Sequence, residues 1–166
     1  MEKSTPMDTS EVTEQIIGYV TLDEADAYVF EHYLSTESIR LDWDALSPTD
    51  RGALLRRSFQ ILEQLPFVSH KTCCAQPHSF PRCPFEEVPE AVKHAQIEQA
   101  IWWADDDNRD YELARNRGVS SYAIGNLNES FNSRRPHSNP LESMGVTSVA
   151  AARLLSQYIM GGYNIR

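Results

Sequence analysis

The residues best suited to chemistry are three cysteines and two histidines in one irregular, proline-rich stretch. They are His70, Cys73, Cys74, His78 and Cys83. Thiolates and imidazoles are the usual ligands of tetrahedral zinc, and a thiol beside a histidine can act as a nucleophile. The spacing fits no familiar zinc finger, because two cysteines are adjacent and the side chains do not form two pairs. We therefore expect reduced thiols, no metal, no cofactor and no catalytic residue.

Other chemistries have weaker signals. The seven glycines form no phosphate-binding pattern, and neighbouring carboxylates are unspecific in an acidic chain. Several aromatic side chains could stack on bases, but a stacking platform needs a basic groove, and here the neighbours are acidic. We expect core packing for these aromatic residues, which are Tyr28, Phe30, Tyr33, Trp102 and Trp103. The sequence therefore does not predict an enzyme.

The charge is divided unevenly along the chain. Residues 1–108 carry eight Lys or Arg and twenty Asp or Glu, whereas residues 109–166 carry seven Arg and four acidic residues. An acidic body repels phosphate backbones, because non-specific DNA affinity comes mainly from Lys and Arg. The basic third could contact nucleic acid or an acidic protein surface.

Length and hydropathy indicate one soluble domain. A chain of 166 residues with 41% hydrophobic content can bury one core. No stretch approaches the roughly 18 uninterrupted apolar residues of a membrane helix, and the first residues lack the pattern of a signal peptide. We expect a flexible segment over residues 1–18, a single domain over 19–160 and a tail over 161–166.

Local signals predict four principal helices. A capping box formed by Thr21 and Glu24 begins the first, which runs to about Leu34. Ser47 begins the second, which stops at Pro66.

The third helix begins near Pro89 and reaches the acidic cluster at residues 105–107, where three acids oppose the helix dipole. Thr147 caps the last helix, which ends at Gly161 and Gly162. Trp43 is a predicted core anchor. Residues 66–89 contain too many prolines for a long element and predict a wrapped loop.

An extended polar stretch over residues 118–131 lies between the third and fourth helices. Small or hydroxyl residues alternate there with Tyr122, Ile124, Leu127 and Phe131. A lone ribbon of this kind is marginally stable and needs pairing or a partner, so we interpret it as an assembly arm. The predicted fold class is mainly α: a small helical bundle with an extended β-ribbon arm and a free C-terminal tail.

The order of several short motifs resembles one protein family. They read YVTLDEADAY at 19–28, WDALS at 43–47, QP at 76–77, FPR at 80–82 and VPEAVK at 88–93. The series resembles the head-tail connector (adaptor) proteins of tailed bacteriophages, some of which are labelled DnaT-like single-stranded-DNA-binding proteins. The resemblance covers roughly residues 19–159. This chain departs from the family pattern at Phe67 and Phe80, where tryptophan is usual, and at Ser69, where glycine is usual.

The resemblance implies a subunit that assembles as an oligomeric ring, commonly of twelve, below the portal protein. Such a ring extends the DNA channel, and double-stranded DNA passes through it without specific binding. The implied partners are the portal, neighbouring adaptor subunits and a stopper or tail-completion protein, with no membrane. The implied location is the head-tail interface of the virion, after assembly in the host cytoplasm.

By the same analogy, the C-terminal tail is the expected portal-binding segment. Its residues are Tyr163, Asn164, Ile165 and Arg166. A replication-type single-stranded-DNA-binding module stays open as the alternative function. Its affinity would come from Arg109, Arg115, Arg117, Arg134 and Arg135.

Overall fold

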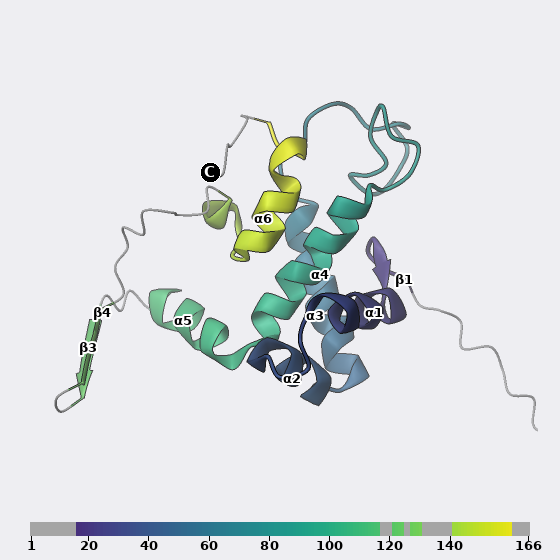
Figure 1. The fold of residues 1–166 in the computed structure, drawn as a ribbon. Helices are drawn as coiled ribbons and strands as arrows, with labels where there is room; N and C mark the ends of the chain where they lie inside the picture. The colour runs from purple at the N-terminus through teal and green to yellow at the C-terminus, as the bar shows by residue number, and fades with distance from the viewer. Residues whose placement is uncertain (1–15, 117–120, 125–126, 131–140, 161–166) are drawn as a thin grey trace, which may run out of the picture.

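The computed structural model describes residues 16–116, 121–124, 127–130 and 141–160 of the chain. Over these ranges the fold is mainly helical, with two small antiparallel sheets (Figure 1). The α-helices are α1 (Leu22–His32), α2 (Ser38–Ala45), α3 (Pro48–Leu62), α4 (Glu90–Ala104), α5 (Asp106–Asn116) and α6 (Val149–Leu155). The strands are β1 (Ile16–Ile17), β2 (Val20–Thr21), β3 (Ser121–Ile124) and β4 (Leu127–Ser130). Two short 3₁₀ helices, η1 (Glu142–Met144) and η2 (Ser156–Tyr158), flank α6.

The predicted helix starts at Thr21 and Ser47 are confirmed. The Glu24 amide donates to Thr21 Oγ1 at 3.1 Å, and the Thr21 amide donates to Glu24 Oε2 at 2.8 Å, which completes the capping box. Ser47 accepts from the Asp50 amide in the same way at the start of α3. The third predicted helix is α4.

Helix α4 is the centre of the fold, with α3 and α6 packed along it (Figure 1). Its side chains are buried on nearly every side, as expected for a helix surrounded by others. Side chains of α4 take part in two apolar clusters. One joins α4 to α6 and the loop over residues 66–89, and the other joins α4 to α1, α2 and α3. Trp43 in α2 is fully buried in the second cluster, as predicted.

Described structure begins earlier than the expected boundary at Tyr19. Strand β1 pairs with β2, with Ile16 opposite Thr21 and Ile17 opposite Val20. The turn between them contains Gly18 at a φ of +79°, where a Cβ atom would come within 2.5 Å of the Phe59 side chain. Glycine is required there by both the backbone conformation and the contact.

The expectation of four principal helices was wrong, because α2 and α5 are helices as well. Helix α2 has no side-chain hydrogen bond at its N-cap, Glu37, so the usual start signal is missing. The acids at 105–107 lie where α4 ends and α5 begins, and Asp106 and Asp107 fall in the first turn of α5, where the helix dipole favours negative charge. Asp105 Oδ1 accepts from the Asp107 and Asn108 amides, at 2.9 and 3.2 Å, and so caps α5.

The cap of the last helix also differs from the prediction. Ser148, not Thr147, is the N-cap residue of α6, and its hydroxyl accepts from the Ala151 amide at 3.2 Å. Thr147 Oγ1 instead accepts from the side-chain amide of Gln99 in α4, at 2.8 Å. One hydroxyl therefore caps the helix, while its neighbour fixes the helix to the centre of the fold.

Residues 66–89 form the predicted loop, and they contain no helix or named strand. Arg82 organises the loop from within, because its guanidinium donates to the carbonyls of Phe67, Val68, Ser69 and Ser79. At the base of the loop, Phe67 pairs with Ile159 through an isolated bridge. Across the described ranges, no helix has the length and apolarity needed to cross a bilayer.

Candidate assembly surface

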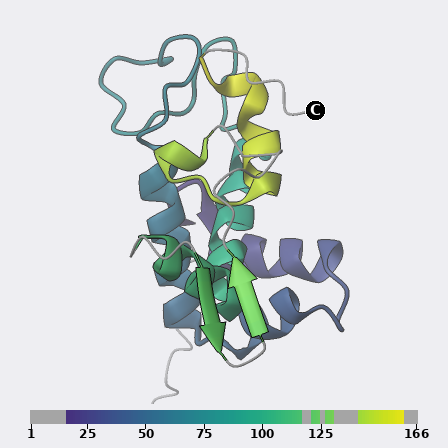
Figure 2. The ribbon, with the colours of Figure 1, turned by 90° about the vertical axis from the view of Figure 1, so that its left-hand side faces the viewer.

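The predicted arm contains a hairpin, whose strands β3 and β4 pair with each other in antiparallel fashion. Figure 1 shows them beyond α5, and Figure 2 shows the two strands side by side. Among the described elements, neither strand packs extensively on a helix. The ribbon therefore satisfies its inner backbone groups by itself, and only its outer edges are available for a further strand.

The hairpin register separates two faces. Tyr122 is opposite Glu129 and Ile124 is opposite Leu127, while Ser121 is opposite Ser130 and Ala123 is opposite Asn128. Cross-strand partners share a face of a sheet, and successive residues alternate between faces. One face therefore carries Tyr122, Ile124 and Leu127 together with Glu129, and the other carries Ser121, Ala123, Asn128 and Ser130. Phe131 and the tail residues Tyr163, Asn164, Ile165 and Arg166 lie outside the described residues.

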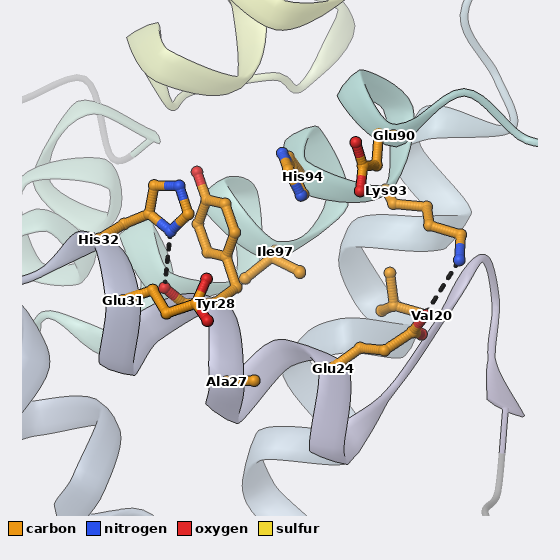
Figure 3. Close-up of a pocket in the computed structure, with 10 residues that line it drawn as sticks. All are labelled: Val20, Glu24, Ala27, Tyr28, Glu31, His32, Glu90, Lys93, His94 and Ile97. Carbon is orange, nitrogen blue, oxygen red and sulfur yellow. Dashed lines mark hydrogen bonds and ion pairs between the residues drawn. The ribbon is translucent and has the colours of Figure 1, made fainter.

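A second feature is a pocket between α1 and the first half of α4, with a volume of about 290 Å³ (Figure 3). Its wall carries three carboxylates, from Glu24, Glu31 and Glu90. Lys93 also lines it, and its Nζ atom lies 3.0 Å from Glu24 Oε1. Burial works to raise the pKa of Glu24, but the Thr21 amide and Lys93 outweigh it, so this pKa lies below its ordinary value.

Aromatic side chains form the other wall of the pocket. The His32 imidazole stacks on Tyr28, with centroids 4.0 Å apart and planes 18° apart. The His94 ring lies 4.6 Å from Tyr28 and 6.0 Å from His32, so the three rings form a triangle. His32 Nδ1 is also 3.0 Å from the Tyr28 carbonyl oxygen. These contacts fix the positions of the three rings relative to one another.

A buried carboxylate, Glu98 of α4, binds Tyr28 of the pocket and its neighbour Tyr33. The hydroxyls of Tyr28 and Tyr33 donate to its two oxygens, each at 2.7 Å. Burial, together with these hydrogen bonds to a negative group, raises the pKa of both tyrosines well above the ordinary value. Sequence analysis missed Glu98, because its partners lie 70 and 65 residues away.

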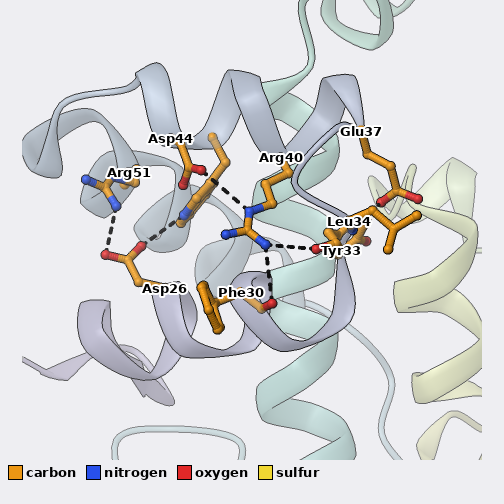
Figure 4. A network of polar contacts seen from close by, with 9 residues as sticks. Asp26, Phe30, Tyr33, Leu34, Glu37, Arg40, Asp44 and Arg51 are labelled. Atoms are coloured by element: carbon orange, nitrogen blue, oxygen red, sulfur yellow. Dashed lines mark hydrogen bonds and ion pairs between the residues drawn. The ribbon is translucent and has the colours of Figure 1, made fainter.

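Polar contacts also tie α1 to α2 (Figure 4). Arg40 donates to the carbonyls of Phe30 and Tyr33, at 3.3 and 2.9 Å, and its guanidinium lies 4.9 Å from the Phe30 ring centroid. Asp44 is 3.6 Å from Arg40 Nε. Phe30 is nevertheless 71% exposed and Leu34 69% exposed. Apolar side chains gathered at this corner are a candidate contact surface.

The remaining contacts of this corner centre on Asp26. It accepts a hydrogen bond from the Trp43 indole at 2.9 Å and forms an ion pair with Arg51 at 2.7 Å. The expected core packing therefore holds for Tyr28 and Trp103, both buried, but was wrong for Phe30. Phe30 is exposed because it lies on the outer face of α1, with the Arg40 guanidinium over its ring.

The residues considered for zinc or thiol chemistry are not brought together. Cys73, Cys74 and Cys83 are exposed free thiols. The His78 ring packs against Phe59, with centroids 5.0 Å apart. Within the described ranges, no three His, Cys, Asp or Glu side chains form a group able to hold a metal ion. The loop therefore offers no support for either chemistry.

Comparison with known proteins adds one family. The family model described as "Putative DnaT-like ssDNA binding protein" matches residues 8–166. The chain belongs to this family. No curated protein and no solved structure gives a significant match. The family's description agrees with the DnaT-like label noted from the sequence, and it favours the single-stranded-DNA-binding alternative over the connector hypothesis.

Proposed function

We propose that this chain is a structural subunit of a phage head-tail connector, in which it forms an oligomeric ring below the portal. The carrying observation is the hairpin β3–β4, which among the described strands pairs with no third strand and carries Tyr122, Ile124 and Leu127 on one face together with Glu129. A two-stranded hairpin alone is marginal in water, so it calls for a protein partner. The ordered motif resemblance over residues 19–159 supports the same function.

The charge of the helical body supports this proposal. Residues 1–108 have twelve more acidic than basic residues, counted from twenty Asp or Glu and eight Lys or Arg. Several of the described cations are already engaged in ion pairs; these are Arg40, Arg51, Lys93 and Arg109. An acidic channel wall offers few phosphate contacts and lets duplex DNA slide. In this proposal the tail at 163–166 contacts the portal and the arm contacts a neighbouring subunit or the tail side.

Single-stranded-DNA binding is the second candidate, and the family description favours it. The seven Arg residues of 109–166 would supply the phosphate contacts. On the helical body, in contrast, the indoles of Trp43 and Trp103 are buried and closed to base stacking. Titration of a fluorescent oligothymidylate against the full chain separates the two candidates. Micromolar affinity at 150 mM salt with a steep salt slope would favour DNA binding and count against the connector.

The connector proposal is tested on the arm. The double variant Tyr122→Asp, Ile124→Asp should abolish ring formation with the portal protein encoded in the same genome, as seen by negative-stain microscopy. The matched control is Ser121→Asp, Ala123→Asp, which adds the same charge to the same strand on its other face. The control should still assemble. Full assembly by the first variant would remove the arm's proposed role.

A further inference from the structure

The pocket between α1 and α4 has an excess of negative charge that the helical body does not compensate. Lys93 pairs with Glu24, but within the described part of the chain neither Glu31 nor Glu90 forms an ion pair. Both lie on the wall of an open volume of about 290 Å³. The carboxylates of the lining therefore favour a cationic ligand.

The aromatic wall narrows the choice of cation. His32, Tyr28 and His94 present π systems beside the carboxylates, and apolar side chains of Val20 and Ile97 complete the lining. A guanidinium is planar, stacks on such rings and can donate two parallel hydrogen bonds to a carboxylate. The compact ammonium group of lysine stacks less well on aromatic rings and lacks the planar fork that donates two parallel hydrogen bonds. An anionic nucleic-acid backbone is repelled by the same groups.

We propose that this pocket receives an arginine side chain from the basic C-terminal third of a second copy of the chain. All seven cations of residues 109–166 are arginines, and Arg134 and Arg135 are adjacent in a stretch rich in Ser, Asn and Pro. Charge complementarity thus joins two different faces of one chain. The inference rests on the proposed ring, because a ring needs such a heterologous, head-to-tail contact.

The test uses the full chain and a synthetic peptide of residues 131–140, which contains both arginines. We expect binding that shifts the NMR signals of the His32 and His94 rings. The variant Glu31→Gln, Glu90→Gln should weaken binding at least about tenfold, whereas Glu86→Gln, Glu87→Gln, which removes two exposed charges from the loop, should change it less than about twofold. Replacing both arginines of the peptide by lysine should also weaken binding clearly.

Three results would overturn the inference: equal loss in both glutamine variants, equal binding of the lysine peptide, or no shift of the two histidines. The ring proposal fails separately. If Glu31→Gln, Glu90→Gln assembles normally with the portal, the pocket has no role but the connector stands. If the peptide binds as expected while the wild-type chain forms no ring with the portal, the contact exists and the connector proposal is wrong.

Discussion

Two tyrosine–carboxylate sites stabilise different kinds of structure in this protein. Glu98 in α4 accepts only from side chains, the hydroxyls of Tyr28 and Tyr33. Glu63, at the end of α3, accepts from the Tyr19 hydroxyl and from the Ser79 backbone amide, the latter at 2.9 and 3.0 Å. The first site joins helix to helix, and the second joins a helix to an irregular loop.

The difference shows which hydrogen bonds order the helices α1 and α4 and which order the loop at residues 66–89. Helices α1 and α4 satisfy their own backbones, so Glu98 needs to fix only their relative position. The loop at residues 66–89 lacks the regular backbone hydrogen bonds of a helix. Its buried amides therefore need acceptors from other parts of the protein. Glu63 supplies one to Ser79, and the Tyr19 hydroxyl accepts from the Phe80 amide at 3.3 Å. The same chemistry therefore orients helices at one site and substitutes for secondary structure at the other.

The largest effect is expected when Glu98 loses both donors. The variant Tyr28→Phe, Tyr33→Phe keeps the aromatic packing but leaves a carboxylate that is only 7% exposed without its two hydroxyls. We expect a loss of roughly 4 kcal/mol in the free energy of unfolding, measured with urea. Adding Glu98→Met to this double variant should restore most of the lost free energy of unfolding, because no buried carboxylate is then left without donors. A loss below about 1 kcal/mol would mean that this site does not hold α1 on α4.

A smaller and more local effect is expected at the second site. Tyr19→Phe removes one donor to Glu63 and one acceptor for Phe80, but Glu63 keeps the Ser79 amide. The expected loss is about 1.5 kcal/mol. Hydrogen exchange should become faster mainly at the Phe80 amide and its neighbours. If the loss equals that of the double variant above, or exchange rises evenly across α1 and α4, the two sites do not differ as described.

The smallest effect appears in alkali. The pKa values of Tyr19, Tyr28 and Tyr33 are raised in the folded protein, by burial first and then by the neighbouring carboxylate. Unfolded tyrosines release protons near pH 10, while the folded ones retain theirs, so stability is complete below about pH 10 and falls above it. From pH 10 to 10.5, Tyr28→Phe, Tyr33→Phe should lose less stability than wild type, by up to about 1 kcal/mol. The prediction would be contradicted if the free energy of unfolding, measured with urea at each pH, fell equally in the two proteins.

Sequence reasoning located the helices that carry strong local signals. Capping residues and apolar periodicity gave α1, α3 and α4, because these features act within a few residues. Helix α2 has no side-chain cap, and α5 is rich in charge, so both depend on tertiary contacts that a sequence does not display. Trp103 Nε1, for example, donates to Glu112 at 2.8 Å and fixes α5 to α4.

The candidate surface was predictable only in part. The extended character of residues 118–131 was predicted from their composition, but the hairpin within them was not, although Gly125 and Asn126 separate the two strand segments by two residues. That spacing is a known hairpin signal. The pocket could not be predicted, because α1 and α4 are joined through residues about 70 positions apart, as in the contact between Tyr28 and Glu98. Long-range pairs of this kind have no local signature.

The junction at Asp105 has a mechanical consequence. This one residue ends α4 and, through its carboxylate, begins α5, so the two helices meet with no linker between them. Helix α5 has 11 residues and is therefore about 16 Å long. A rotation of about 10° at Asp105 would displace its far end by about 3 Å, by lever geometry on that length. A small angular adjustment at one side chain is thus amplified into a translation at the far end of α5.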